Sequence, residues 1–359
     1  MNNSKKKLSI TFLLPGRGVG GGSRAIVEFG NHLLNRGHKV RIFYRSEPIS
    51  FRDAVRLTYI RIRYGNNDWL RNFHGPVQSY NQLKPNQFAS DEIILSMCAQ
   101  TTLDAHDLPD MHGIKVFHCH GAELENWDQM IQSWKLPKYI LVVSSHLIDI
   151  FKKEVNKDVL GIVPDGVDCN LYYPAVDEID RNGIGATFRW GYTKGPEMVL
   201  QVMKELDKKY PSMPKVSFGN GRKPNGFDNV FYTRLPTVKQ AREIYSNSMV
   251  WLLTSRLEGF GMSVLEAMAC GCVVVSTDCG GPRDVIQDGV NGYIVPVDDI
   301  NAMMECISIL VNDEKQLSRM AKAAIETAHR FSWDAASLKL EGYLYSIYKS
   351  HMGIDTSIK

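Results

Sequence analysis

Long apolar runs are missing from this sequence of 359 residues, and so is a strong excess of either charge. No stretch approaches the roughly 20 apolar residues that a membrane-spanning helix needs. The formal net charge of +3 is too small for bulk nucleic-acid binding. Apolar residues make up 44% and charged residues 23%, a composition that excludes disordered and fibrous classes.

Paired cysteines are also missing. The chain has seven cysteines, an odd number, and only Cys270 and Cys272 lie close together. A single glycine separates these two inside an apolar run, which is not the spacing of a zinc or redox site. We therefore expect reduced, mostly buried thiols in a cytoplasmic protein, and no metal site.

The N-terminal segment has the lysines of a signal peptide but lacks its other parts. The apolar run at 8–14 is short, and glycines with Arg17 and Arg24 follow it in place of a cleavage site. This run is better interpreted as a first β-strand, which again favours a cytoplasmic location.

Apolar runs alternate with helical patterns along the whole chain, as is typical of α/β proteins with parallel sheets. The first run leads through a glycine-rich loop into a helix at 23–37, with Ser23 as its N-cap and Gly37 at its end. The turn-rich stretch 162–183 predicts a linker, after which a second series begins. At about 100–200 residues per domain, we expect two Rossmann-like domains, followed by a final amphipathic helix. The predicted ranges are 1–168, 169–330 and 331–359.

The stretch 255–286 contains the strongest chemical signal. An apolar strand ends before it, and a glycine-bearing loop, EGFG, leads into the short helix MSVLEAMAC. The N-terminus of such a helix presents free N–H groups and positive partial charge, which suit a pyrophosphate. Glu258 precedes the loop and Glu266 lies in the helix, so the two carboxylates could accept hydrogen bonds from a sugar and from a ribose.

Glu258 and Glu266 around GFGMSVL, followed by AMACG and a GGP loop, resemble the donor-binding signature of retaining family-4 glycosyltransferases. The resemblance covers most of the chain. It implies the GT-B fold, an α/β architecture with two Rossmann-like domains facing across a cleft and the last helix crossing back to the first. The donor-binding residues that it implies are Gly21, Gly22, Gly259, Phe260, Gly261, Met262, Ser263, Val264 and Glu266.

The same resemblance implies a catalytic set of four residues. The stretch ATFRWGYTKG is similar to the start of the family's second domain, where an arginine and a lysine meet the donor diphosphate; the matching positions are Arg189 and Lys194. Two cations can neutralise a leaving pyrophosphate without a metal. His120 matches the histidine that orients the transferred sugar, and Glu258 completes the set. His118, two residues earlier, is expected to point to the opposite face of its strand and to be structural.

Other interpretations of these patterns remain open. Arg189 and Lys194 could be ordinary surface charges. A glycine-rich loop at 20–22 also suits NAD-dependent enzymes. These enzymes have an acidic residue at the end of the second strand that binds the ribose, whereas this chain has Arg45 there. The base-recognition region departs from the family because Thr233 and Arg234 stand where a glycine is usual. Asp284 replaces the usual glutamate of the GGP loop.

The predicted function is retaining transfer of a sugar from a nucleoside diphosphate to an acceptor hydroxyl, in bacterial cell-surface polysaccharide or glycolipid synthesis. The nucleotide-sugar is a co-substrate, and no cofactor is expected. The alternatives are another GT-B enzyme, such as an epimerase or a glycan phosphorylase, and a non-catalytic nucleotide-sugar-binding protein. A phosphorylase would need a cofactor lysine and a longer chain. A degenerate binding protein would be expected to have lost some of the set Glu258, Glu266, Arg189, Lys194 and His120.

Positive charge is concentrated near the N-terminus. Residues 1–100 contain 15 Lys and Arg against 6 Asp and Glu, a net charge of +9. Basic residues among aromatic and aliphatic neighbours can lie on an anionic membrane surface. This pattern predicts weak peripheral contact with a membrane, which would suit a glycan or lipid-linked acceptor; a solvated helix face with a strand is the alternative. The five arginines concerned are Arg52, Arg56, Arg61, Arg63 and Arg71.

Overall fold

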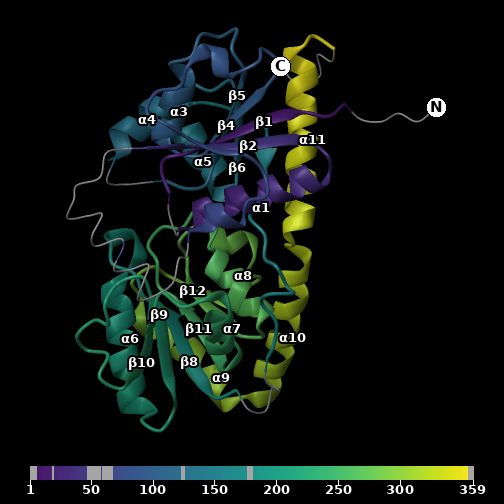
Figure 1. The fold of residues 1–359 in the computed structure, drawn as a ribbon. Coiled ribbons are helices and arrows are strands. Elements are labelled where there is room, and N and C mark those ends of the chain that lie inside the picture. Colours follow the sequence, from purple (N-terminus) through teal and green to yellow (C-terminus); the bar gives the residue numbers. More distant parts are fainter. Residues whose placement is uncertain are drawn as a thin grey trace. The chain divides into compact units, whose positions relative to one another are not determined.

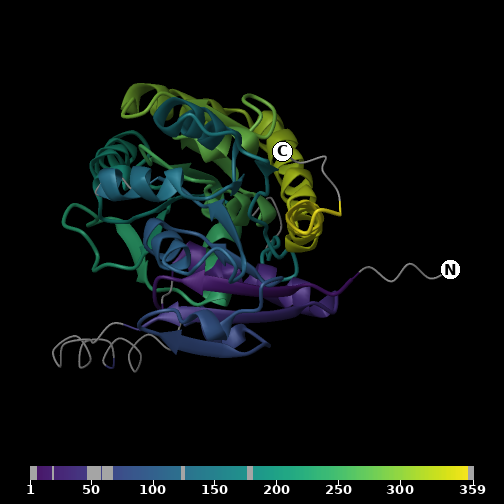
Figure 2. The ribbon, with the colours of Figure 1, turned by 90° about the horizontal axis from the view of Figure 1, so that it is seen from above.

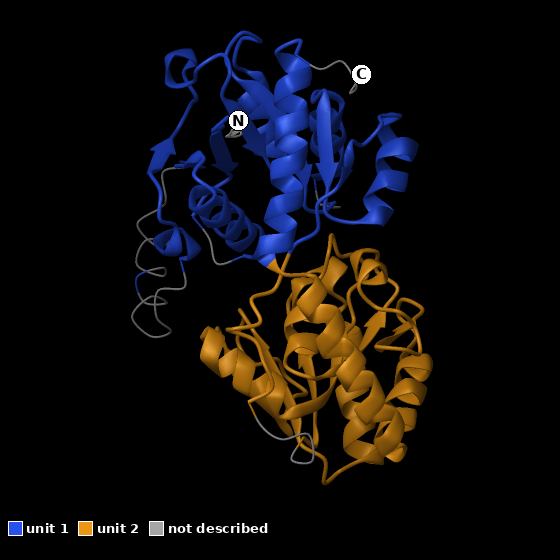
Figure 3. Ribbon diagram, turned by 90° about the vertical axis from the view of Figure 1, so that its right-hand side faces the viewer, with its two compact units in different colours: residues 1–165, 333–359 blue, residues 166–332 orange. Residues whose placement is uncertain are grey.

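Two parallel sheets, one from each half of the chain, form the framework of the protein. The computed structural model describes residues 6–17, 20–46, 58, 68–122, 126–175 and 181–354. The chain divides into unit 1, residues 1–165 with 333–359, and unit 2, residues 166–332 (Figure 3). The predicted domain limits at 168 and 330 differ from these by two or three residues.

Unit 1 contains a seven-stranded sheet in the order β3-β2-β1-β4-β5-β6-β7, and every pair of strands in it is parallel. β1 lies between β2 and β4, so the strand order reverses there (Figures 1 and 2). Such a reversal opens a crevice at the carboxyl edge of a parallel sheet. The strands are β1 (Ser9–Leu14), β2 (Lys39–Arg45), β3 (Val77–Tyr80), β4 (Ile93–Ser96), β5 (Ile114–Cys119), β6 (Tyr139–Val142) and β7 (Gly161–Ile162). The helices are α1 (Gly21–Asn35), α3 (Ala99–His106), α4 (Trp127–Lys135), α5 (Ser145–Val155) and α11 (Trp333–His351).

Helix α1 follows the glycine-rich loop and begins earlier than the sequence predicts. Its N-cap is Gly20, which makes no side-chain capping bond, and Ser23 lies within the first turn. The prediction of Ser23 as N-cap was therefore wrong, because the extended backbone of Gly20 already starts the helix. The predicted end is confirmed: Gly37 adopts φ +84°, a left-handed conformation that favours glycine.

The last helix, α11, belongs to unit 1 and packs against α1, as the GT-B resemblance implies (Figure 1). The Trp333 ring meets Phe29 of α1 edge-on at a centroid distance of 5.4 Å. Glu341 is mostly buried and lies 2.9 Å from His38 Nε2, while His38 Nδ1 accepts a hydrogen bond from the Leu8 backbone N–H. The helix is thus held both by ring packing and by a buried hydrogen bond that His38 Nε2 donates to the Glu341 carboxylate.

Unit 2 repeats the Rossmann-like pattern with six parallel strands in the order β10-β9-β8-β11-β12-β13, so its strand order reverses between β8 and β11. The strands are β8 (Gly183–Thr187), β9 (Lys215–Gly219), β10 (Val230–Arg234), β11 (Ser248–Leu253), β12 (Val273–Thr277) and β13 (Gly292–Val295). The helices are α6 (Pro196–Lys209), α7 (Val238–Ser246), α8 (Met262–Ala269), α9 (Ile300–Asn312) and α10 (Glu314–Arg330).

Strand β11 is buried on both faces, as its uninterrupted apolar sequence predicts. Val250 and Leu252 belong to a core that includes residues of α6 and α9. Trp251 points to the other face, where its ring lies 4.5 Å from that of Tyr245 in α7. Trp251 pairs in register with Gly185 of β8, and a Cβ built on Gly185 would lie only 2.1 Å from the indole ring.

Within the described residues, no helix is long and apolar enough to cross a membrane. All seven cysteines lie in the described part of the chain, and none forms a disulfide. Four of the five arginines of the predicted membrane-contacting stretch, Arg52, Arg56, Arg61 and Arg63, lie outside the described residues. Arg71 is described and exposed, and Asp68, just before it, forms an ion pair with Arg17 at 2.6 Å.

Gly185→Ala should destabilise unit 2 by about 1–3 kcal/mol, because a methyl group there overlaps an indole ring that has no room to move. Chemical denaturation followed by tryptophan fluorescence measures the change. Gly342→Ala in α11 is the control: its Cβ would meet no atom within 4 Å, so stability should be unchanged or slightly higher. A Gly185→Ala protein as stable as the wild type would show that the Trp251 packing is wrong.

Candidate functional site

Three loops meet at the carboxyl edge of the sheet in unit 2. They follow three neighbouring strands, β8, β11 and β12, and comprise residues 188–195, 254–261 and 278–284. The first two loops flank the position where the strand order reverses, which is where parallel α/β sheets bind ligands. Three of the four predicted catalytic residues, Arg189, Lys194 and Glu258, lie in these loops.

Backbone hydrogen bonds join the three loops into one framework. The Glu258 N–H donates to the Cys279 carbonyl at 2.8 Å, and the Gly281 N–H donates to the Glu258 carbonyl at 3.2 Å. On the other side, the Arg256 N–H donates to the Thr193 carbonyl at 2.8 Å. The position of Glu258 therefore depends on its main chain, and its side chain is left for other contacts.

Close packing explains Gly281 of the GGP loop. A Cβ at this position would lie 2.4 Å from Phe260 Cα and 2.5 Å from the Gly259 carbonyl oxygen, so any larger residue would force the two loops apart. Gly261 is needed for a different reason, since it adopts φ +92° immediately before α8. Two glycines of the string that carries the family resemblance are thus required by the path of the backbone.

The side chains of Glu258 and Lys194 form an ion pair, with Nζ 2.9 Å from Oε1. The Ser255 hydroxyl donates a second hydrogen bond to the same carboxylate oxygen at 2.7 Å. Within the part of the chain that the structure describes, no hydrogen bond reaches Oε2 of Glu258. The pair is partly exposed, with side-chain exposures of 29% for Lys194 and 17% for Glu258, so both groups can also meet a ligand.

Helix α8 begins at Met262, directly after the Glu258 loop. The N–H groups of Met262 and Ser263 belong to its first turn, whose donors have no acceptor within a helix. Val264 is bonded back to the Gly261 carbonyl at 2.8 Å and its side chain is buried, as is that of Phe260. These two side chains therefore support the helix start rather than contact solvent.

Glu266 lies on the side of α8 that faces α7. Its Oε2 accepts a hydrogen bond from the Tyr245 hydroxyl at 3.2 Å. Burial raises the pKa of Tyr245 well above its usual value, so the phenol keeps its proton and remains the donor. The sequence analysis missed Tyr245, because nothing local to α7 shows that it faces Glu266.

The charged groups around Lys194 differ in their surroundings. Arg189 is exposed and has no hydrogen-bond or ion-pair partner among the described residues. Arg256, which the sequence analysis missed, is tied to Glu197 of α6 at 3.2 Å and to Asp298 at 2.8 Å. Arg256 thus braces the loop, whereas Arg189 is available to an anion.

In unit 1, Gly21 and Gly22 form the first turn of α1 at the carboxyl edge of the sheet. A Cβ at Gly20 or Gly22 would meet no atom of the described residues within 4 Å, so packing within the described part of the chain does not itself require glycine at these two positions. The open space there is compatible with the predicted close approach of a ligand.

His120 follows the end of β5, and both of its ring nitrogens face partners within unit 1. Nε2 lies 3.1 Å from His118 Nδ1, and Nδ1 lies 3.4 Å from Asp165 Oδ1. The expectation that His118 points to the opposite face was wrong, because side chains two residues apart in an extended chain lie on the same side. Burial lowers the pKa of His118 to about 4 and that of His120 well below its usual value.

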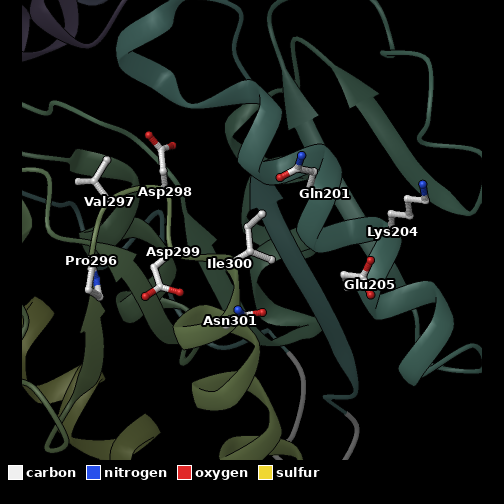
Figure 4. A pocket seen from close by; sticks show the side chains of 9 residues that line it. All are labelled: Gln201, Lys204, Glu205, Pro296, Val297, Asp298, Asp299, Ile300 and Asn301. Atoms are coloured by element: carbon white, nitrogen blue, oxygen red, sulfur yellow. The ribbon is translucent and has the colours of Figure 1, made fainter.

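A pocket in unit 2 and the arrangement of possible metal ligands show what else the protein could bind. A pocket of about 690 Å³ lies between α6 and the segment 296–301 (Figure 4). It contains none of the predicted site residues, and its Asp298 and Asp299 are engaged by Arg256 and by the start of α9. No group of three or more His, Cys, Asp or Glu side chains in the described ranges could hold a metal ion.

Comparison with known families matches both halves of the chain. The description "Glycosyltransferase Family 4" matches residues 19–171, and "Glycosyl transferases group 1" matches residues 186–327. D-inositol 3-phosphate glycosyltransferase of Corynebacterium urealyticum is 26% identical over 210 residues, 50% of each chain. The putative glycosyltransferase EpsD of Bacillus subtilis is 27% identical over 291 residues, 69% of this chain and 73% of EpsD. The chain spans about half the length of the first of these relatives.

Solved structures agree with this fold. Sucrose-phosphate synthase from Thermosynechococcus elongatus has a TM-score of 0.74 at 16% identity, covering 96% of this chain and 100% of the other. HepE from Anabaena, in complex with UDP-glucose, has a TM-score of 0.74 at 15% identity, covering 94% of this chain and 100% of HepE. These structures show the fold, and the family descriptions matched by the two halves of the chain show that it belongs to the family-4 glycosyltransferases.

Proposed function

We propose that this protein transfers a sugar from a nucleoside diphosphate to an acceptor hydroxyl, with retention at the anomeric carbon and without a metal. The observation that carries the proposal is the Lys194–Glu258 ion pair beside the N-terminus of α8, at the reversal of strand order in unit 2. Cation, carboxylate and free N–H groups are the groups that a sugar diphosphate needs. The complex of HepE with UDP-glucose supports a nucleoside diphosphate as the carrier.

The ion pair suggests how donor binding would change the site. A diphosphate near the start of α8 competes with Glu258 for the Lys194 ammonium group. Once Lys194 turns to the phosphate, Glu258 Oε1 retains only the Ser255 hydroxyl and can accept a hydrogen bond from a sugar hydroxyl. Oε2 is available to a second hydroxyl, so one carboxylate could hold two vicinal groups of the sugar.

In the proposed reaction the bond between the anomeric carbon and the phosphate oxygen breaks while a bond to the acceptor oxygen forms on the same face. The departing phosphate takes the acceptor's proton. Arg189, Lys194 and the N–H groups of Gly261, Met262 and Ser263 would stabilise the charge on that phosphate. Glu266, positioned by Tyr245, would bind the ribose. The sugar-orienting role of His120 stays a prediction, because in the structure both of its ring nitrogens face His118 and Asp165.

The acceptor is proposed to be a glycan or lipid-linked molecule of the bacterial cell surface. Names among the relatives support this class, including the phosphatidyl-myo-inositol mannosyltransferase of Mycolicibacterium smegmatis, 28% identical over 192 residues. A weak peripheral contact of the protein with an anionic membrane would bring such an acceptor close to the site. That contact stays a prediction from the arginine-rich stretch of the sequence.

Lys194→Gln should weaken binding of a nucleoside diphosphate by about ten- to a hundredfold, because it removes a charged hydrogen bond to the phosphate. Isothermal titration with UDP and with GDP measures the loss and identifies the base. Lys208→Gln, which alters a surface pair with Glu205, is the matched control and should bind as the wild type does. Unchanged affinity in Lys194→Gln would remove this residue from the donor site.

Glu258→Ala should reduce transfer by on the order of a hundredfold or more, because the lost hydrogen bonds strengthen as the sugar reacts. The fold should persist, since the main-chain bonds of residue 258 remain. Incubation with a labelled donor, with and without acceptor, measures transfer and separates it from simple binding or epimerisation. Glu205→Ala is the control for loss of a surface carboxylate, and near-normal turnover in a folded Glu258→Ala protein would defeat the assignment.

Transfer should survive an excess of EDTA, because Arg189 and Lys194 supply the positive charge that a metal provides elsewhere. Activity lost in EDTA and restored by manganese or magnesium would show that a divalent ion takes part in the reaction.

A further inference from the structure

The Arg256 side chain joins the loop after β8 to two other elements of unit 2. Its Nη1 donates to the Tyr192 carbonyl at 2.9 Å and to Glu197 Oε2 at 3.2 Å, and its Nε donates to Asp298 Oδ2 at 2.8 Å. The guanidinium also lies over the Tyr192 ring, with Cζ 4.7 Å from the ring centroid. One planar side chain therefore contacts the candidate-site loop, the first turn of α6 and the segment before α9.

These contacts hold the start of the turn that carries Lys194. Residues Tyr192–Lys194 form a single 3₁₀ turn, so a restraint on its first residue is a restraint on the whole turn. The main chain next to Lys194 is held as well: the Thr193 carbonyl accepts a hydrogen bond from the Arg256 N–H at 2.8 Å. The Arg256 residue thus fixes two neighbouring positions of this turn, one through its main chain and one through its side chain.

The carboxylate partners of Arg256 are largely exposed. The exposed fraction of the side chain is 65% for Glu197 and 49% for Asp298, against 17% for Arg256. Exposed ion pairs contribute little to stability. Asp298 also adopts φ +62°, a left-handed conformation that costs a non-glycine residue free energy. The cluster is therefore better suited to fixing the position of a loop than to stabilising the fold.

We propose that Arg256 is a positioning residue for Lys194. It holds the 192–194 turn in the place from which the Lys194 ammonium group reaches a diphosphate, and it does not itself contact that ligand. Arginine suits this role because its planar group donates hydrogen bonds from its edges while one face lies on a ring, which the compact ammonium group of a lysine does not do. The effect on ligand binding rests on the proposed function, whereas the restraint on the turn does not.

Hydrogen exchange of the full chain measures the restraint without any ligand. The amides of Lys194 and Gly195 donate hydrogen bonds at the turn. In Arg256→Gln these amides should exchange about tenfold faster than in the wild type, because the turn loses its side-chain anchor. Arg36→Gln, which removes an ion pair with α11 in unit 1, is the control and should leave their exchange unchanged. Equal exchange in the wild type and Arg256→Gln would overturn the proposal.

A double-mutant cycle tests whether Arg256 acts through Lys194. Arg256→Gln should weaken binding of UDP or GDP by about tenfold in the wild-type background, measured by isothermal titration. In the Lys194→Gln background the same change should cause little further loss, and Arg256→Lys should restore only part of the affinity. Equal losses in both backgrounds would show that Arg256 binds the diphosphate directly and would contradict a positioning role.

Asp298→Gly separates positioning from stability. Glycine adopts a φ of +62° without strain, so the free energy of unfolding should change little although Arg256 loses an acceptor. Exchange at Lys194 should nevertheless rise, and UDP or GDP should bind more weakly. Binding that falls only in parallel with stability across these variants would assign Arg256 a purely structural role. If exchange changes as expected but the wild type binds neither nucleotide, the proposed function fails and the restraint on the turn stands.

Discussion

The main-chain pairing of Glu258 with Cys279 and Gly281 is the constraint on which the site in unit 2 depends. Two hydrogen bonds, of 2.8 and 3.2 Å, hold the loop after β11 against the loop after β12. They require Gly281 to approach the backbone of residues 259–260, and Gly261 to take a left-handed conformation where α8 begins. This pairing determines where α8 begins and where the Glu258 carboxylate lies. It thereby also determines which carboxylate Lys194 contacts.

The charged side chains in this part of unit 2 form ion pairs, and these differ in the number of partners that each charge has. Arg256 has two carboxylates and an aromatic ring around it, and it holds its loop against α6. Lys194 has one partner, which is itself a predicted ligand-binding group. A partly exposed ion pair contributes little to stability, so exchanging Glu258 for a phosphate would cost the fold little while changing what the carboxylate can bind.

Unit 1 differs from unit 2 in that its polar contacts are buried. The His118–His120–Asp165 chain and the His38–Glu341 contact both lie almost out of solvent. Burying a polar group without a partner costs free energy, so the hydrogen bonds of His38, His118 and His120 favour a single arrangement of the elements that carry them. His38, just before β2, and Glu341 link the start of that strand to the returning helix α11, and the histidine chain links β5 to the segment after β7.

The amino-acid sequence by itself determined the alternation of strands and helices, the two Rossmann-like units, the final amphipathic helix and the loop containing Glu258. Local patterns predict these features. The patterns are uninterrupted apolar strands, glycines where the backbone turns or packs closely, and the amphipathic face of 333–348. Tertiary structure decided which distant side chains meet. Tyr245 reaches Glu266, Arg256 reaches Asp298, and Asp165 lies opposite His120 across 45 residues of chain. Local sequence does not encode such pairs, because strand order and crossover helices bring them together. The orientation of His118 relative to His120 was also predicted wrongly, although side chains two residues apart in an extended strand lie on the same side.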